Sequence, residues 1–159
     1  IFDPQTFLSS TVNRERASHR SGFEATLDWT MGEKLRLGAN YAFLKATEPD
    51  DLGSSVRETR RPKHSGAITA DGEAGRFTYG ASLAYSGARA DTDFETFPFE
   101  RVRLHSYWLA GLKVGYRLAD GIELFARAAN ALDTSYEDAL EYRTGGRSLY
   151  GGIRLSRGR

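Results

Sequence analysis

Side chains that could bind a metal ion are few in this sequence. Asp91, Asp93 and Glu95 lie close together and could hold a cation through carboxylate oxygens. Such a run is more often solvated surface charge, which is the interpretation we favour. The histidines are too scattered for a ligand spacing such as H-x-x-x-H, so we expect no metal site. They are His19, His64 and His105.

No arrangement typical of catalysis occurs in the sequence. Serine, aspartate and histidine never form a recognisable nucleophile motif. The Gly145-Gly146-Arg147 segment neither follows a strand nor opens a helix, so it is not a phosphate-binding loop. Cysteine is absent, which excludes disulfides and thiolate metal ligands. We therefore predict that the protein is not an enzyme and needs no cofactor.

Overall charge and hydropathy exclude little else. The 22 basic residues balance 21 acidic ones, so charge gives no reason to expect a nucleic-acid partner. No apolar run approaches the roughly 18 residues of a membrane-spanning helix, and the mean hydropathy is −0.51. These values fit a soluble protein, but transmembrane β-barrels alternate apolar and polar residues and also look hydrophilic on average.

The elements that must position any site are strands, because apolar residues recur with a period of two and no segment has helical periodicity. The alternating segments are 23–31, 35–43, 65–71, 77–86, 108–118, 122–128 and 149–155. A partial strand is also expected within 1–12. Most of these segments are longer than strands of globular sheets and suit a tilted membrane crossing.

The connections between these strands alternate in length. Tight turns with glycine are expected at 31–35, 71–76 and 118–122, and long polar loops at about 47–59, 88–103 and 133–145. An up-and-down barrel with short periplasmic turns and long external loops has this arrangement. The sequence therefore predicts an all-β, antiparallel transmembrane barrel of about eight strands.

The two faces of the predicted sheet differ in polarity. One face is apolar, and no second set of strands is available to cover it, so we expect lipid to cover it. Aromatic residues near the strand ends fit the two girdles of an outer-membrane barrel, although any half-buried sheet is rich in aromatics. The polar face is expected to line a lumen; its members include Glu24, Asp28, Arg36, Asn40, Lys113, Arg117, Arg127 and Arg154.

The end of the sequence carries a family signature. Asn130, Leu132, Asp133 and Tyr136 match an "N-L-F-D-x-x-Y" segment, and 146–152 matches a "G-R-x-x-Y-x-G" strand. Weaker matches are Asn13 and Ala17 with 22–24, the Arg-Arg-Pro of 60–62, and the aromatic-proline loop 91–99. In order and spacing the chain resembles the C-terminal β-barrel portion of TonB-dependent outer-membrane receptors, most closely the cobalamin transporter branch.

This resemblance implies that residues 1–159 are the C-terminal segment of a larger barrel of about 22 strands, without the plug domain and the TonB box. It implies active uptake of a bulky, scarce nutrient, cobalamin first and a ferric siderophore next, across the outer membrane of a Gram-negative cell. The implied partners are that small-molecule ligand, TonB through the missing N-terminal part, the lipid bilayer and the barrel assembly machinery.

Three substrate-binding residues follow from the resemblance. Arg60 matches an arginine that faces ligand in the cobalamin branch and could donate to amide or phosphate oxygens. Phe94 stands where that branch has a tyrosine, so packing would persist without a hydroxyl. Tyr142 matches a tyrosine at the rim. The alternative is that all three are ordinary loop residues.

The chain ends depart from a complete family member. Ile1-Phe2-Asp3-Pro4 has no signal peptide, so we expect a piece of a longer chain. The family normally ends on an aromatic residue, whereas this chain ends Ser156-Arg157-Gly158-Arg159, which puts assembly of the chain alone in doubt.

Two other architectures remain open. A self-contained eight-stranded outer-membrane barrel with a structural or adhesive role would need a strand in 1–12, interrupted by Pro4, that pairs with 149–155. A soluble lipocalin-like binding barrel would point its apolar residues inward.

Overall fold

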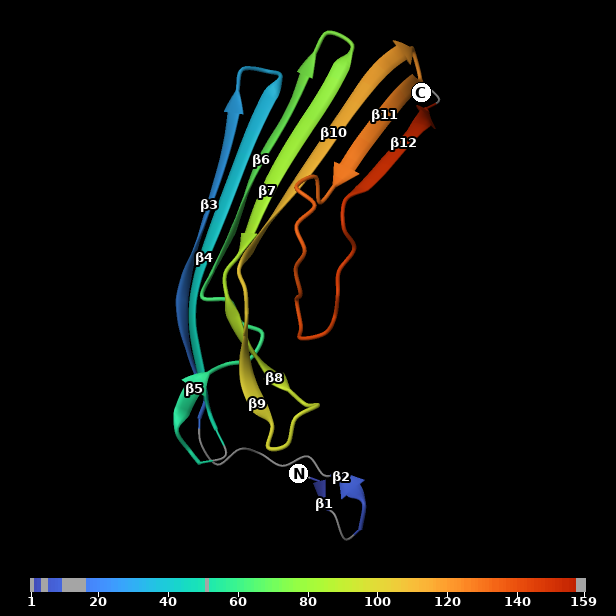
Figure 1. Cartoon of the computed structure of the whole chain (residues 1–159). Helices are drawn as coiled ribbons and strands as arrows, with labels where there is room; N and C mark the ends of the chain where they lie inside the picture. The colour runs from blue at the N-terminus through green and yellow to red at the C-terminus, as the bar shows by residue number, and fades with distance from the viewer. Residues whose placement is uncertain (1, 4–5, 10–16, 51, 157–159) are drawn as a thin grey trace.

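The computed structural model describes residues 2–3, 6–9, 17–50 and 52–156, and all regular structure in them is β. One sheet of seven antiparallel strands, in the order β12-β11-β10-β7-β6-β4-β3, forms most of the molecule, and β5 pairs with the end of β4 (Figure 1). The strands of this sheet are β3 His19–Met31, β4 Leu35–Pro49, β5 Ser55–Arg57, β6 His64–Ala74, β7 Phe77–Ser86, β10 Tyr107–Ala119, β11 Ile122–Ala129 and β12 Ser148–Leu155.

The seven predicted long strands are all present, and each pairs with the next one along the chain. Several extend further than the alternation indicated. β3 begins at His19 and β4 ends at Pro49, because their ladder continues from Met31↔Leu35 as far as His19↔Thr47. β4 therefore continues into the start of the segment 47–59, which was expected to be loop.

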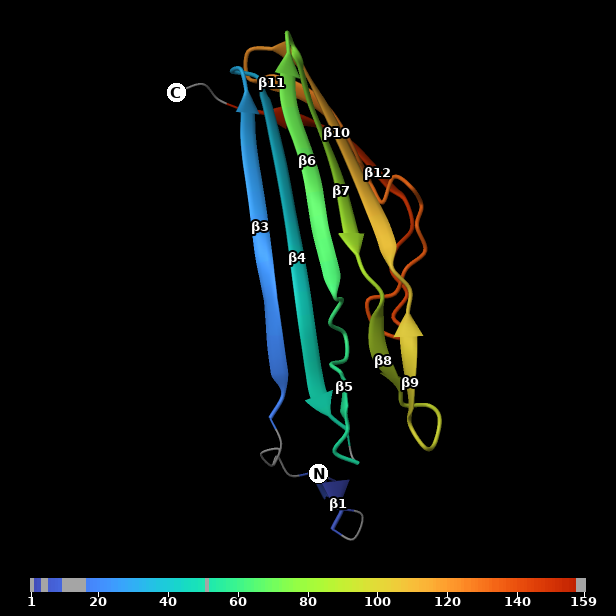
Figure 2. The same cartoon turned by 90° about the vertical axis from the view of Figure 1, so that its left-hand side faces the viewer.

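Three shorter strands lie in segments predicted as loops. One is β5, and the others are β8 Arg89–Asp93 and β9 Glu100–Leu104, which pair as a separate hairpin. Figure 2 shows this hairpin continuing beyond the ends of β7 and β10. The long polar loop expected at 88–103 therefore contains a hairpin that the sequence did not predict. Residues 88–93 do alternate, with Arg89, Asp91 and Asp93 on one side, but these charges hid the strand pattern.

The partial strand expected near the start is two short strands instead. β1 Phe2–Asp3 and β2 Leu8–Ser9 pair with each other, in a sheet of their own. Asn13, one of the residues of the family signature, lies outside the described residues.

Three tight turns join the long strands at one end of the sheet. Each contains a glycine with positive φ, at Gly32, Gly75 and Gly121. A side chain at Gly32 or Gly75 would meet no atom within 4 Å, so it is the left-handed backbone, and not a lack of space, that favours glycine there. The long connections all lie at the other end (Figure 1).

Cross-strand pairing places apolar side chains on one face. Phe23 lies opposite Phe43, and Ile68 opposite Leu83. Most large apolar side chains of this face are exposed. Ala46 and Leu104 are the buried hydrophobic residues among those described. The sheet therefore has no covered core, as expected for a wall whose apolar face meets lipid. No helix long and apolar enough to cross a membrane occurs in the described part of the chain.

The other face is polar and concave. A hollow of about 1060 Å³ is lined by residues from β3 and β4 on one side of the sheet to β12 on the other. A lipocalin-type barrel would have the opposite arrangement, with apolar side chains inside. The sheet is open, with β3 and β12 at its edges, and no described strand pairs with the free edge of β12. The small closed barrel is therefore not the arrangement observed.

Candidate functional site

Three long loops, 50–63, 87–106 and 130–147, gather at the end of the sheet opposite the tight turns (Figure 1). We call them the first, second and third loops. The second loop contains the β8–β9 hairpin. Side chains on β8 connect it to the other two loops.

Asp91 is the residue at which all three loops meet. Its Oδ1 accepts from Nε of Arg60 at 3.0 Å, and its Oδ2 accepts from the Leu140 amide at 2.8 Å. The Thr92 amide donates to Oδ1 at 2.9 Å. The side chain is only 1% exposed. Asp91 is therefore not part of a solvated acidic run, as we had expected, but a buried and fully hydrogen-bonded carboxylate.

The environment of Asp91 favours its ionised form. Burial acts against the charged form, but hydrogen bonds from the Leu140 and Thr92 amides, together with the Arg60 guanidinium, outweigh it and hold the pKa of the carboxyl below its usual range. The backbone reinforces this contact, because the Arg60 amide donates to the Ala90 carbonyl at 2.7 Å.

Arg89, two residues earlier on the same face of β8, binds the third loop. It is 3% exposed, and its guanidinium donates to the Asp138 carboxylate at 3.0 Å, to the Asp138 carbonyl at 3.2 Å and to the Glu137 carbonyl. It also lies over the Tyr107 ring, 5.2 Å from the centroid, and the Tyr107 hydroxyl donates to Asp138 at 2.6 Å. A buried arginine with this many partners fixes the position of the loop it binds.

The first loop is held to β3 and to the second loop by further arginines. Arg20 on β3 donates to both carboxylate oxygens of Glu58, at 2.7 Å each, and Arg61 lies 3.5 Å from the same carboxylate. Arg101 on β9 donates to the Arg57 carbonyl. The bidentate geometry gives the Arg20 contact its directional specificity.

The family signature at 130–147 closes the base of the third loop. Asn130 accepts from the Thr134 amide at 2.9 Å and donates to the Thr134 carbonyl at 2.9 Å. Asp133 accepts from the Arg147 amide at 2.8 Å, across the neck of the loop. A side chain at Gly146 would lie 3.0 Å from Asp133 Oδ1. The signature residues are therefore a local clamp that fixes where the loop leaves and re-enters the sheet.

The tip of the second loop is apolar and exposed. Phe94 packs against Phe99 with ring centroids 5.4 Å apart, and Phe97 packs against Phe99 at 6.2 Å. Phe97 is 92% exposed. Rings that pack on each other while most of their surface meets solvent can bind an apolar or aromatic group.

The third loop lies near this tip and also exposes an aromatic ring. Tyr142 is 74% exposed. Repulsion from the Glu95 carboxylate on the second loop, helped by desolvation and by Asp93, raises the pKa of the neighbouring Glu141 above its usual value. The 2.8 Å hydrogen bond from the Leu140 amide to Asp91 holds the two loops together here.

The predicted binding residues lie one on each of the three loops that meet at Asp91. Arg60 binds Asp91 directly and Phe94 follows it three residues later, while Tyr142 lies two residues beyond Leu140. Arg89 and Asp91 themselves were missed as positioning residues. The signal available in the sequence was the alternation of residues 88–93 described above.

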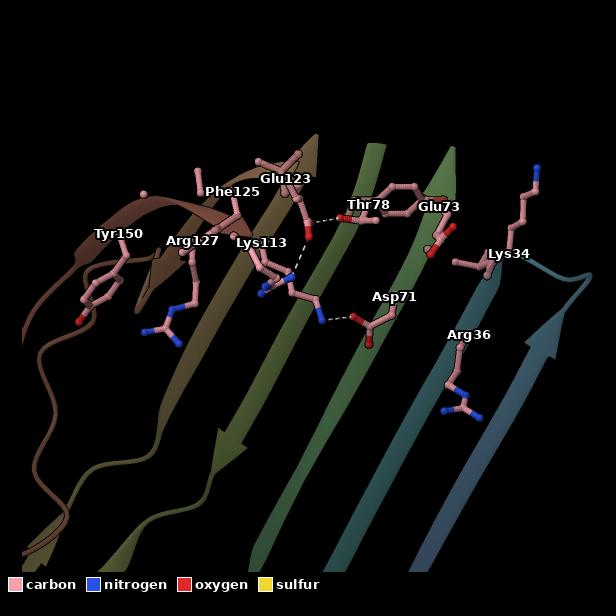
Figure 3. A pocket seen from close by; sticks show the side chains of 18 of the residues that line it. Lys34, Arg36, Asp71, Glu73, Thr78, Lys113, Glu123, Phe125, Arg127 and Tyr150 are labelled. Atoms are coloured by element: carbon pink, nitrogen blue, oxygen red, sulfur yellow. Dashed lines mark hydrogen bonds and ion pairs between the residues drawn. The ribbon is translucent and has the colours of Figure 1, made fainter. Parts of the chain in front are cut away.

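The concave face at the opposite end carries exposed ion pairs (Figure 3). Lys113 Nζ lies 2.6 Å from Asp71, and Arg117 donates to Glu73 at 2.8 Å. Lys113 and Asp71 both lie opposite Gly80 on the intervening strand. A side chain at Gly80 would lie 2.2 Å from the Lys113 side chain, so the glycine lets charges from two non-adjacent strands meet.

Among the residues described, no three acidic or histidine side chains are grouped in a way that could hold a metal ion.

Comparison with protein families gives a match over most of the chain. The family model described as "TonB dependent receptor-like, beta-barrel" matches residues 1–131.

Solved structures with the same fold are outer-membrane and siderophore receptors. The ferripyoverdine receptor of the outer membrane of Pseudomonas aeruginosa superposes with a TM-score of 0.74 at 18% identity, over 87% of this chain and 19% of the receptor. The ferric-catecholate import receptor Fiu of Escherichia coli K12 gives 0.73 at 21%, over 87% and 21%. The siderophore receptor PiuA of Acinetobacter baumannii gives 0.69 at 20%, over 87% and 22%. This chain thus spans about a fifth of the length of these receptors.

Proposed function

We propose, from the premise that this chain belongs to the TonB dependent receptor-like β-barrel family, that it forms the ligand-capturing C-terminal segment of a receptor that takes up a ferric siderophore. The family consists of transport receptors of the outer membrane and is not a class of enzyme. Residues 1–159 would supply part of the barrel wall and three of the external loops.

The observation that carries this proposal is the meeting of the three loops at Asp91, at the end of a sheet whose concave face is polar. The loops present an arginine and several aromatic rings, and the concave face of the wall below them has a hollow whose lining includes charged side chains. Capture at the loops followed by passage along the wall fits binding and gated transport. Energy coupling through TonB and closure by a plug belong to the rest of the receptor in this proposal.

Ferric siderophores are the ligand class we favour. The superposed receptors are named for ferripyoverdine, a ferric catecholate and a siderophore. The cobalamin assignment depended on the 91–99 loop, where Asp91 proves to be a buried structural carboxylate and the aromatic residues form an exposed tip. Cobalamin is therefore the competing ligand in the test, not the first choice.

Arg60, Phe94 and Tyr142 are the proposed ligand contacts. Hydrogen bonds of the Arg60 side chain to described residues run through Nε, and 52% of this side chain is exposed. Its outer edge can therefore donate to anionic ligand oxygens. The exposed rings of Phe94 and Tyr142 offer flat apolar surface on the two loops beside it.

The test is ligand binding by a complete receptor that contains this chain, followed by quenching of intrinsic tryptophan fluorescence in detergent. The probes are ferripyoverdine, a ferric catecholate and cyanocobalamin. We expect saturable binding of a ferric siderophore, weakened about tenfold or more by Arg60→Ala, since a charge-assisted hydrogen bond contributes about 1.5–3 kcal/mol. Tyr142→Ala should weaken binding less.

Arg76→Ala is the matched control, because Arg76 is an exposed cation in a tight turn at the far end of the sheet and does not line the hollow. It should leave affinity unchanged. Saturable binding of cyanocobalamin alone would keep the receptor and refute the siderophore proposal. Absence of binding of all three probes would refute both.

A further inference from the structure

Among the described residues at the loop end, Asp91 is distinguished by what its carboxylate connects. Its two oxygens bind donors from the first loop, the third loop and its own strand, and it is buried. The two contacts between loops join residues 31 and 49 positions apart in the chain. One side chain therefore fixes two loops relative to a third.

Among the described residues, Asp91 is also the acidic partner of Arg60, the proposed ligand-binding arginine. Nε of Arg60 lies 3.0 Å from Oδ1 and 3.2 Å from Oδ2. An arginine free of such a contact samples many rotamers, and fixing it on binding would lower affinity. With Nε held, the outer edge of the guanidinium stays in one orientation.

We propose that Asp91 is a positioning residue for ligand capture: it holds Arg60 and the third loop in their binding positions before the ligand arrives. This inference rests on the proposed function. The ligand then meets a preassembled surface and does not have to order three loops at once. Preorganisation of this kind increases affinity by reducing the entropy lost on binding.

An asparagine at this position would have nearly the same shape but the wrong hydrogen-bonding capacity. All the groups around Asp91 are donors: two backbone amides and a guanidinium. The carboxylate accepts from all of them. The amide of asparagine would turn a donor toward at least one of these donors and would remove the charge opposite Arg60. Asp91→Asn is therefore a small change that breaks the contact.

The structure offers a matched control in Asp138. This carboxylate of the third loop binds Arg89 of the second loop and Tyr107 at the start of β10, and Arg60 is not among its described partners. Asp138→Asn should loosen the third loop without affecting the arginine. The two substitutions separate a general effect on loop order from an effect that acts through Arg60.

The first arm of the experiment is a double-mutant cycle in the complete receptor, using whichever ferric siderophore probe binds the wild type. We expect Asp91→Asn to weaken binding about tenfold. Combined with Arg60→Ala, it should bind at least about threefold tighter than the product of the single effects, because the two share one contact. For Asp138→Asn and Arg60→Ala, the loss of affinity in the double variant should equal the product of the two single losses within about twofold. If the affinity loss of the Asp91→Asn, Arg60→Ala double variant equals the product of the two single losses, the proposal is overturned.

The second arm needs no ligand. Amide hydrogen exchange should become faster in residues 138–142 of Asp91→Ala, because this change removes both carboxylate oxygens and the Leu140 amide loses its acceptor, while the strands β6 and β7 stay protected. Unchanged exchange at 138–142 would also overturn the proposal. If Asp91→Asn does not assemble, Arg60→Lys tests the same contact from the other side, since it keeps the charge and removes Nε.

The two arms distinguish failure of this inference from failure of the proposed function. If none of the probes binds the wild type but exchange at 138–142 rises, the siderophore proposal fails and the loop-positioning role of Asp91 stands. If a ferric siderophore binds and the cycle is fully multiplicative, the function stands and the positioning role of Asp91 fails.

Discussion

Ion pairs occur at both ends of the sheet, but the two ends differ in burial and in what the pairs connect. At the tight-turn end, the Lys113 and Asp71 side chains are 62% and 47% exposed. At the loop end, one member of each main pair is almost fully buried, Asp91 opposite Arg60 and Arg89 opposite Asp138. The same residue types therefore have different energetic roles in one molecule.

Backbone hydrogen bonding explains the difference. At the tight-turn end, the ladder of β6, β7 and β10 fixes the strands, and the charges meet because the register already places them together. Exposed pairs of this kind contribute little. At the loop end, most contacts between the loops are made by side chains such as Arg60, Arg89 and Asp91. Ion pairs there determine where the loops lie, and leaving one buried partner alone is costly.

The largest expected effect comes from removing the buried cation at the loop end. Arg89→Met leaves two backbone carbonyls without their donor and leaves the 66% exposed Asp138 with the Tyr107 hydroxyl, and loss of hydrogen bonds from a charged group costs about 1.5–3 kcal/mol. We expect the opening free energy of residues 136–144, measured by hydrogen exchange, to fall by about this amount while the long strands stay protected. Arg103→Met, which removes an exposed arginine from the same hairpin, is the control. Equal exchange in the two variants would contradict the comparison.

A much smaller effect is expected at the tight-turn end. Lys113→Met removes the exposed pair with Asp71 but leaves the strand ladder intact, so the loss should stay below about 1 kcal/mol. The measurement is hydrogen exchange of β6 and β10 amides in the complete receptor. A loss as large as that of Arg89→Met would show that the wall, too, depends on its charges.

The smallest effect concerns the repulsion between the second and third loops. The pKa of Glu141 is raised from its ordinary value of 4.5, chiefly by Glu95. Protonated Glu141, the form present below pH 4.5, does not oppose the folded arrangement of the two loops. Its ionisation destabilises that arrangement as pH rises through the raised pKa. At neutral pH, Glu141→Gln should bring the third loop slightly closer to the hairpin, and the difference from wild type should vanish below pH 4.5.

Spin labels at positions 96 and 145 would measure this distance, since both residues are exposed and lie on the two loops concerned. Glu33→Gln, which removes an exposed carboxylate in a tight turn at the opposite end of the sheet, should leave the distance unchanged at either pH. A difference between Glu141→Gln and wild type that persists below pH 4.5 would mean that charge repulsion is not its cause.

The wall could be predicted from sequence because its determinants are local. Alternation in segments such as 23–31 and 77–86 specifies which face each side chain occupies, and glycines at Gly32, Gly75 and Gly121 specify the turns. Strand ends were less predictable. The ladder of β3 and β4 runs past the alternating residues to His19↔Thr47, where Arg20 meets Glu58. Nothing in the sequence of either strand indicates that pairing.

The loop end could be predicted only in part. The position of Arg60, Phe94 and Tyr142 on three separate loops followed from the resemblance, and their role in binding remains a proposal. From the acidic run at 91–95 we expected Asp91 to be solvated, which was wrong. Burial of this carboxylate depends on hydrogen-bond donors from residues 60 and 140, which are distant in the sequence. The strand β8 was missed for the same reason, since its charged residues are buried by other loops.

By itself the sequence determined an antiparallel wall with one apolar face, tight turns at one end and long loops at the other, because strand and turn preferences act between neighbours in the chain. Tertiary structure alone decided which charges are buried and which loops touch. Those contacts join residues that are separated by 31 to 49 positions in the chain and are not connected by a continuous β-ladder. A local sequence pattern therefore cannot predict them. Asp71 and Asp91 are the same residue type on strands of one chain, yet one is a half-exposed lumen charge and the other the buried junction of three loops.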